Sequence, residues 1–209
     1  MKICIFGADG RTGIEIVELA KSKGLEITAF VYSGSSPAFS HKGIKIIQGD
    51  VLDYPQVLQA CRGVDAVISA LGHIKGSDPR MQTKGTSNIV TAMKENNVQR
   101  VISLTGTGAR CSWDTPSYID IILNFIVKIV DKDRIEDGIG HVKVLQNSGL
   151  DWTIIRVLKL SSGKNRGENY TLTTGGPVEL VTSRKKVARI MVDMLKDTKY
   201  SGALPVVSA

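Results

Sequence analysis

Three glycines near the N-terminus have the spacing of a phosphate-binding loop. Gly7, Gly10 and Gly13 follow an apolar segment and precede a segment of helical period. Glycines at such a junction let the backbone turn tightly and approach a pyrophosphate, whose charge then meets unpaired N–H groups and the positive end of the helix. A strand-to-helix turn without a ligand is the alternative, and the position directly after the first predicted strand favours binding. The residues expected to hold a dinucleotide are Gly7, Asp9, Gly10, Arg11, Thr12 and Gly13.

The end of the second apolar segment bears on the choice of dinucleotide. Many NAD-binding domains carry an acidic residue about twenty positions beyond the glycines, where it holds the ribose 2′-hydroxyl. Here that segment ends in Tyr32 and Ser33 without a carboxylate, which disfavours strict NAD use. Arg11, Ser33 and Ser35 offer partners to a 2′-phosphate, although Arg11 could equally be a solvated residue at the helix N-terminus. The sequence therefore favours NADP(H) over NAD(H).

Three further loops follow apolar segments and should reach the same edge of a sheet. Asp50 and Val51 would lie near the adenine, where the Asp50 carboxylate could accept a hydrogen bond from the exocyclic amine or serve only as a turn residue. The small residues of Ala70-Leu71-Gly72 would let the backbone pass close to a ribose, and the following His73 fits a loop position better than a base. Thr105 is the candidate for contact with the reacting part of the nicotinamide, with a turn role as the alternative.

The elements that must position these loops are short β-branched runs that alternate with longer segments of helical period. Such alternation is typical of βαβ units on a parallel sheet. Most runs are continuously apolar, which indicates strands covered by helices on both faces. We therefore predict an α/β fold with a doubly wound, mainly parallel sheet. The predicted strands are Lys2 to Phe6, Glu26 to Tyr32, Ile44 to Gln48, Asp65 to Ser69, Arg100 to Leu104 and Trp152 to Arg156.

The segments between and after these strands are predicted to be helical. Helices are expected over Thr12 to Lys23, from Asp53, over Ser77 to Asn97 and over Arg184 to Asp197. Between Pro116 and Asn147 the pattern is helical but contains Gly138 and Gly140, which predicts a break or a kink there. A polar loop, Ser161 to Asn169, and a strand, Tyr170 to Thr174, would form a small C-terminal elaboration on the substrate side.

The composition is that of an ordinary globular protein. Of 209 residues, 42% are hydrophobic and 22% charged, which is enough for a core without disulfides or metals. We expect one domain over residues 1–209. A net charge of +7 raises the chance of an anionic partner such as a nucleic acid, a phosphate or an acidic cofactor.

Neither a metal site nor a membrane segment is predicted. The cysteines, Cys4, Cys61 and Cys111, are far apart and have no histidine at zinc-ligand spacing, which fits a reducing compartment. The longest apolar run, Ile119 to Val130, has half of the roughly 20 residues that a membrane span requires. The apolar stretch at the N-terminus is too short for a signal peptide. We expect a cytoplasmic protein.

Together these residues resemble the short-chain dehydrogenase/reductase superfamily in its atypical, NAD(P)H-binding branch, which comprises NmrA-like proteins and proteins like the flavin reductase biliverdin reductase B. The resemblance covers nearly the whole chain and implies a Rossmann domain that binds a nicotinamide dinucleotide. It is carried by Ile5 to Gly13, Gly49 to Leu52, Asp65 to Ile68, Asn88 to Lys94, Trp113-Asp114, Lys143 to Leu150, Ser148 to Arg156 and Gly176-Pro177.

The sequence differs from the families that it resembles at three places. Flavin-reductase-like members have an arginine for the 2′-phosphate where this chain has Tyr32. The better-known superfamily enzymes use a Tyr-x-x-x-Lys pair, and no tyrosine here is followed four residues later by lysine. Gly106 and Lys159 stand where the flavin reductase has a serine beside the nicotinamide and a histidine near the substrate.

These departures narrow the chemistry. A ketone that accepts hydride becomes an alkoxide and benefits from a positioned acid, whereas a flavin or quinone delocalises the incoming charge and can take its proton from water. We therefore predict an NAD(P)H-dependent reductase of a planar, flavin-like or quinone-like acceptor. Trp113 offers a stacking face, although it could pack under its loop instead. Lys159 or Arg110 could meet an anionic group on the acceptor.

Two other classes of function compete with this prediction. A dinucleotide redox sensor without turnover would act through a protein partner, and the apolar side chains of Tyr118 to Val130 could form its binding surface, a core face or a substrate lid. Nucleic-acid binding would depend on net charge and on the triplet Arg184-Lys185-Lys186. That triplet begins an amphipathic helix and is better explained as a solvated face, so we disfavour nucleic acid as a partner.

Overall fold

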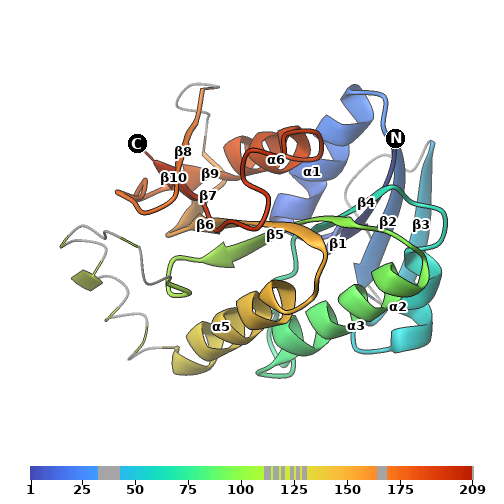
Figure 1. The fold of residues 1–209 in the computed structure, drawn as a ribbon, viewed down its shortest axis with the longest axis horizontal. Coiled ribbons are helices and arrows are strands. Elements are labelled where there is room, and N and C mark those ends of the chain that lie inside the picture. The colour runs from blue at the N-terminus through green and yellow to red at the C-terminus, as the bar shows by residue number, and fades with distance from the viewer. Residues whose placement is uncertain are drawn as a thin grey trace.

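The computed structural model describes residues 1–32, 43–110, 114, 118, 121–122, 125, 128, 131–163 and 169–208. Its centre is an eight-stranded sheet in the order β3-β2-β1-β4-β5-β6-β10-β8 (Figure 1). All pairs are parallel except β8 with β10. The strands are β1 (Lys2–Phe6), β2 (Glu26–Tyr32), β3 (Ile44–Gly49), β4 (Ala66–Ser69), β5 (Arg100–Gly106), β6 (Asp151–Val157), β8 (Thr171–Thr173) and β10 (Val206–Ser208). The predicted Rossmann-type doubly wound sheet is confirmed.

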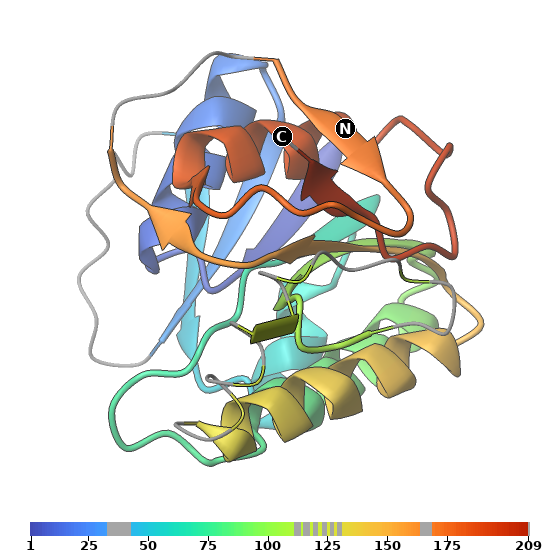
Figure 2. The same ribbon diagram turned by 90° about the vertical axis from the view of Figure 1, so that its left-hand side faces the viewer.

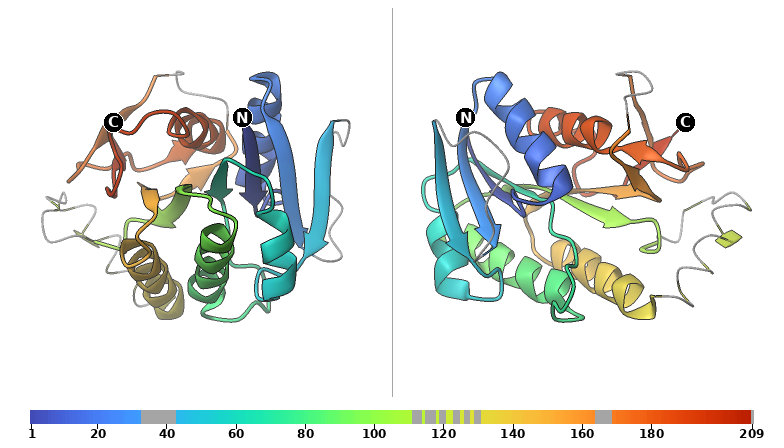
Figure 3. Two further views of the ribbon diagram at one scale, coloured as in Figure 1. Left: turned by 45° about the vertical axis from the view of Figure 1, so that its right-hand side comes forward. Right: turned by 180° about the vertical axis from the view of Figure 1, so that it is seen from behind.

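Helices cover both faces of this sheet. In Figures 2 and 3 the blue α1 and the red α6 lie on one face, and α2, α3 and α5 lie on the other. The helices are α1 (Arg11–Ser22), α2 (Tyr54–Ala60), α3 (Met81–Glu95), α5 (Lys132–Gln146) and α6 (Arg184–Asp193). None of the described helices is long and apolar enough to cross a membrane.

Strand β1 shows why the predicted strands are continuously apolar. Ile3 and Ile5 belong to the core beneath α1 and α6, whereas Cys4 and Phe6 belong to the core beneath the other helices. All four side chains are fully buried. Because successive side chains point to opposite faces of a sheet, a central strand between two helical layers must be apolar at every position. Cys4 is a free thiol in this core, as is Cys61 in the same cluster.

The break predicted at Gly138 and Gly140 is wrong. Helix α5 continues through both glycines. A Cβ atom at Gly138 would lie 3.1 Å from Thr105 Oγ1, and one at Gly140 would lie 2.3 Å from Thr83 Oγ1. The two glycines therefore let α5 pack closely against β5 and α3, and this packing outweighs their low helix propensity.

The C-terminal part adds a small second sheet at the edge of the fold. Strand β7 (Leu160–Ser161) pairs in parallel with β9 (Thr182–Ser183), directly before α6. The Ser183 hydroxyl accepts a hydrogen bond from Lys186 N at 3.1 Å and caps that helix. The sequence indicated the elaboration but not β7, β9 or β10, which are two or three residues long. They carry little periodicity by themselves, and they bring α6 to the sheet beside α1.

Candidate active site

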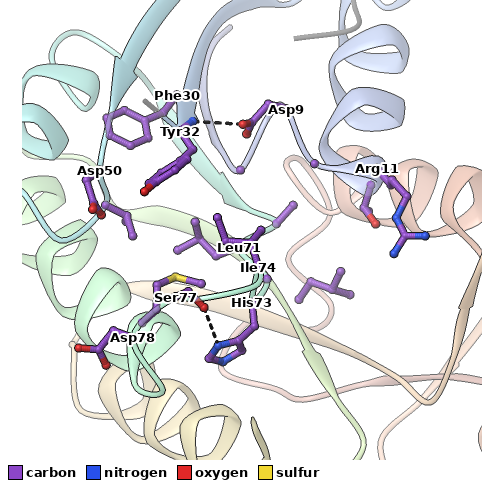
Figure 4. Close-up of a pocket in the computed structure, with 18 of the residues that line it drawn as sticks. Asp9, Arg11, Phe30, Tyr32, Asp50, Leu71, His73, Ile74, Ser77 and Asp78 are labelled. Carbon is purple, nitrogen blue, oxygen red and sulfur yellow. Dashed lines mark hydrogen bonds between the residues drawn. The ribbon is translucent and has the colours of Figure 1, made fainter. Parts of the chain in front are cut away.

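A cleft of about 710 Å³ runs past the ends of β1, β2, β3 and β4 (Figure 4). Ligands of open α/β sheets bind at this edge, outside the carboxyl ends of the strands. Most of the predicted cofactor residues line the cleft: Gly7, Asp9, Gly10, Arg11, Thr12, Tyr32, Asp50, Val51, Ala70, Leu71 and Gly72. Gly13 is buried outside its wall, and Ser33 lies outside the described residues.

The glycine loop has the geometry of a phosphate cradle. Gly7 has a φ of 72°, and a Cβ there would come within 2.9 Å of Ala70 O. A Cβ at Gly13 would lie 2.0 Å from Gly7 O, so only glycine lets α1 approach this loop. At Gly10 a Cβ would meet only Gly7 O, at 3.2 Å. No side chain caps α1 and its first turn has no acidic residue. The positive helix end is left for an anionic ligand.

A carboxylate from another segment lies at the end of β2, where the last residues of the strand itself have none. Asp9 in the glycine loop accepts a hydrogen bond from Tyr32 N, at 3.2 Å (Figure 4). Many NAD-binding domains place an acidic group near this strand end to bind the ribose hydroxyls. Asp9 was expected to bind the cofactor as part of the glycine loop, but the sequence did not indicate that its carboxylate lies at the end of β2. Asp50 stabilises the turn after β3, because its carboxylate accepts a hydrogen bond from Leu52 N at 2.9 Å. The same residue also lines the cleft.

Arg11 lies across the cleft from Tyr32 and Asp50, near which the adenine is expected. Figure 4 shows Arg11 on one side of the cleft, and Tyr32 and Asp50 on the other. The predicted contact of Arg11 with a 2′-phosphate therefore has little support from this arrangement, because that phosphate belongs with the ribose near the end of β2. Arg184 lines the same cleft, and burial together with the nearby positive charge of Arg11 lowers the pKa of Arg184.

The predicted catalytic and substrate residues lie outside the cleft wall where they are described. Thr105 is buried on β5, and its hydroxyl faces Gly138 of α5. The neighbouring Leu104 points to the other face of the sheet and lines the cleft, as strand alternation requires. Lys159 is exposed, and the next residue, Leu160, lines the cleft. Trp113 is outside the described residues.

The triplet that begins α6 is not a solvated face, contrary to the prediction. Arg184 is only 9% exposed and lines the cleft. Lys186 is half-buried, and its Nζ lies 2.9 Å from Glu179 Oε1. Lys185 alone of the three is exposed. The apolar side of the helix is buried as predicted, with Val187, Ile190, Met191 and Met194 in the core.

A buried carboxylate behind the cleft was missed by the sequence analysis. Asp137 of α5 accepts hydrogen bonds from Gln82 N and Thr83 N, both at 2.8 Å, and so caps α3. Its Oδ2 also lies 2.9 Å from His73 Nε2, a close contact that is not aligned as a hydrogen bond. His73 Nδ1 lies 3.3 Å from Ser77 Oγ. The pair fixes the loop after β4, which forms part of the cleft wall.

The buried histidine of α5 should make the stability of the fold depend on pH. His141 of α5 is fully buried, and its Nε2 lies 2.7 Å from Ser103 Oγ. Burial lowers the pKa of His141 to about 4, although the charge of Asp137 opposes the shift. The unfolded chain binds a proton at this residue below its usual pKa and the folded chain does not. The contribution of His141 to the free energy of unfolding is therefore fully present above pH ~6.5. It is lost as the pH falls from there toward the pKa of His141 in the folded state.

The expected loss is about 3 kcal/mol of unfolding free energy between pH ~6.5 and ~4 from His141 alone. Urea unfolding at a series of pH values would measure it in the wild type and in His141→Gln, which cannot titrate. The variant should show a distinctly shallower decline over this range. Equal declines in the two proteins would contradict the account.

No three His, Cys, Asp or Glu side chains of the described residues lie close enough together to hold a metal ion.

A family model for NAD(P)H-binding proteins matches residues 7–198. The chain belongs to that NAD(P)H-binding family. The family assignment agrees with the glycine loop, whose residues Gly7 and Gly10 line the cleft.

A relative is similar in sequence to this NAD(P)H-binding protein over most of the chain, and solved structures share its fold. An uncharacterized chloroplastic protein of Arabidopsis thaliana is 29% identical over 213 residues, covering 96% of this chain and 74% of that protein. ChuY, an anaerobilin reductase from Escherichia coli O157:H7, has a TM-score of 0.83 at 20% identity, covering 100% of this chain and 97% of that chain. A short-chain dehydrogenase/reductase from Veillonella parvula in complex with NADP has a TM-score of 0.82 at 19% identity. The match covers 100% of this chain and 94% of that chain.

Proposed function

We propose that this protein is an NAD(P)H-dependent reductase of a planar, flavin-like or quinone-like acceptor. The observation that carries the proposal is one cleft that joins the glycine loop to an apolar wall containing Met81, Leu104 and Leu160. When bound, the reduced nicotinamide supplies a hydride. The chain's own contribution is to hold the dinucleotide at the glycine loop and to keep an acceptor against the apolar wall, away from water.

The positions of the tyrosine and the histidine in the cleft wall also favour such an acceptor. Tyr32 stands at the end of β2, on the adenine side (Figure 4). His73 has both ring nitrogens close to protein partners, Asp137 and Ser77. An acceptor that delocalises charge needs no strong acid beside it, whereas a simple ketone does. The similar fold of ChuY, an anaerobilin reductase, adds support for a conjugated acceptor.

The test is steady-state oxidation of NADH and NADPH in the presence of FMN, riboflavin or a small quinone. Loss of the near-ultraviolet absorbance of the reduced nicotinamide reports turnover. We expect rapid oxidation with at least one acceptor. Thr105→Val should change the rate little, because Thr105 is buried against α5 rather than exposed to the cleft. A strong loss of turnover with unchanged cofactor affinity would return Thr105 to the catalytic role that the sequence suggested.

The choice of cofactor depends on Asp9. The sequence favours NADPH, and one structural neighbour was solved with NADP. However, the Asp9 carboxylate beside Tyr32 N would repel a 2′-phosphate and accept a hydrogen bond from a 2′-hydroxyl. We therefore expect NADH to bind at least as tightly as NADPH, contrary to the preference indicated by the sequence.

Asp9→Asn should shift the ratio of NADH to NADPH dissociation constants toward NADPH by about tenfold, because it removes one negative charge near the phosphate. The Asn side-chain oxygen can still accept from Tyr32 N. Asp78→Asn is the matched control, since Asp78 also lines the cleft but lies far from the end of β2 (Figure 4). Titration of each cofactor by its fluorescence gives both constants. An unchanged ratio in Asp9→Asn would exclude Asp9 as the determinant.

A dinucleotide sensor that acts through a protein partner is the second candidate. The observation that favours it is a set of exposed apolar side chains, Tyr118, Ile121, Ile122 and Phe125. Of the side chains predicted to form a partner surface or a substrate lid, Ile122 and Phe125 are in this set, whereas Ile119, Ile126 and Ile129 lie outside the described residues. Tight cofactor binding without oxidation by any acceptor would support the sensor over the reductase.

A further inference from the structure

Arg184 differs from the other buried arginines of the described chain in having no acidic partner. Arg100 Nη1 lies 2.8 Å from Asp151 Oδ1, and Arg156 forms a two-pronged pair with Asp114. Arg184 donates from Nη1 to the neutral Ser162 Oγ at 2.8 Å, and no carboxylate among the described residues lies within ion-pair distance of it. A guanidinium has five donors, and holding its charge on a largely buried side chain without a counter-charge is costly.

A second positive charge, that of Arg11, lies in the wall of the same cleft as Arg184. Arg11 lines the cleft with Arg184, and both burial and the nearby charge of Arg11 lower the pKa of Arg184. Each arginine is the first residue of its helix, and neither α1 nor α6 has an acidic residue in its first turn. Two positive helix ends therefore add to two guanidinium charges. The ligand-free protein has like charges opposed here, and an anion would relieve them.

We propose that Arg11 and Arg184 form a subsite for a phosphate or carboxylate group, on the side of the cleft away from the adenine. The biological role of this subsite rests on the proposed reductase function, because the subsite would bind an anionic group of the acceptor or of the cofactor. Its anion could come from the acceptor, since Arg184 and the apolar Leu160 line the cleft together. It could also be the cofactor pyrophosphate, since Arg11 belongs to the glycine loop. In both cases Arg11 contacts an anion other than the 2′-phosphate.

The decisive variant is Arg184→Gln, with Lys185→Gln as the matched control. Lys185 is the next residue of α6 and is exposed, so its variant removes the same charge outside the cleft. Inorganic pyrophosphate should raise the melting temperature of the wild type and of Lys185→Gln, and should raise that of Arg184→Gln much less. Without any ligand, Arg184→Gln should melt at the same temperature as the wild type or higher, because it removes an unpaired buried charge.

Binding of larger ligands identifies the source of the anion without requiring turnover. If the acceptor supplies it, Arg184→Gln should weaken FMN binding by about tenfold and riboflavin binding by much less, because only FMN carries a phosphate. If the cofactor supplies it, Arg184→Gln should weaken NADH and NADPH equally. Unchanged binding of pyrophosphate, FMN and both cofactors would overturn the proposal, as would equal losses in Lys185→Gln. Because these are equilibrium measurements, absence of hydride transfer would refute only the reductase function.

Discussion

Replacing Gly10 with valine should weaken the binding of NADH and NADPH by about a hundredfold or more while leaving the fold intact. The backbone of Gly10 has φ −70° and ψ 158°, which valine adopts without strain. Its Cβ would lie 3.2 Å from Gly7 O, a tight contact that a shift of the backbone by a few tenths of an ångström relieves, and Gly10 lines the cleft, so we expect the two methyl groups to reach into it. They would occupy the space through which a pyrophosphate must approach the loop. Cofactor fluorescence titration and thermal melting measure the two effects separately.

Gly24→Val is the control for a general loss of stability. Gly24 follows α1, has a φ of 72° and has no neighbouring atoms within 4 Å of a built Cβ. Valine there costs backbone strain but lies outside the cleft wall. This variant should melt at a lower temperature and bind both cofactors normally when folded. Normal cofactor binding by Gly10→Val would mean that the dinucleotide does not use this loop.

Replacing Asp137 with alanine should lower the free energy of unfolding by about 3–5 kcal/mol. The substitution leaves Gln82 N and Thr83 N without the acceptor that caps α3, and it leaves His73 without its acidic neighbour. Buried donors without acceptors carry the full cost of their desolvation. Urea unfolding at neutral pH measures the loss.

Asp133→Ala provides the comparison for Asp137. Asp133 is an exposed residue in the first turn of the same helix. Its removal should cost less than about 1 kcal/mol, from a weakened interaction with the helix dipole. Similar small losses in both variants would show that the buried carboxylate contributes little to the stability of the fold. A large loss confined to Asp137→Ala would confirm its capping role.

The regular strands and the glycine loop could be predicted because each rests on local sequence. A strand such as β1 is apolar at every position, and the spacing of Gly7, Gly10 and Gly13 is visible without a structure. The failure at Gly138 and Gly140 has a different origin. Their low helix propensity is a local property, whereas the space they leave for Thr105 and Thr83 is set by packing between α5 and its neighbours.

The side-chain roles that the sequence did not indicate depend on which loops meet at the cleft. Asp9 was expected to bind the cofactor, but its position at the end of β2 depends on the glycine loop contacting that strand. Arg184 looked like part of a solvated face because the pairing of β7 with β9, which brings it to the cleft, involves strands of two residues. Asp137 had the pattern of an ordinary helix carboxylate. Its role depends on α3, whose N-terminus begins more than fifty residues earlier in the chain.

The most direct test of the account is an anaerobic single turnover. Protein preloaded with NADH or NADPH is mixed rapidly with FMN or a small quinone, and the absorbances of the nicotinamide and the acceptor are followed together. We expect the two absorbances to report equal amounts of reaction at the same rate, because one hydride passes directly from the nicotinamide to the acceptor within the cleft. Tight binding of both cofactors with no change in any acceptor would contradict the proposed reductase.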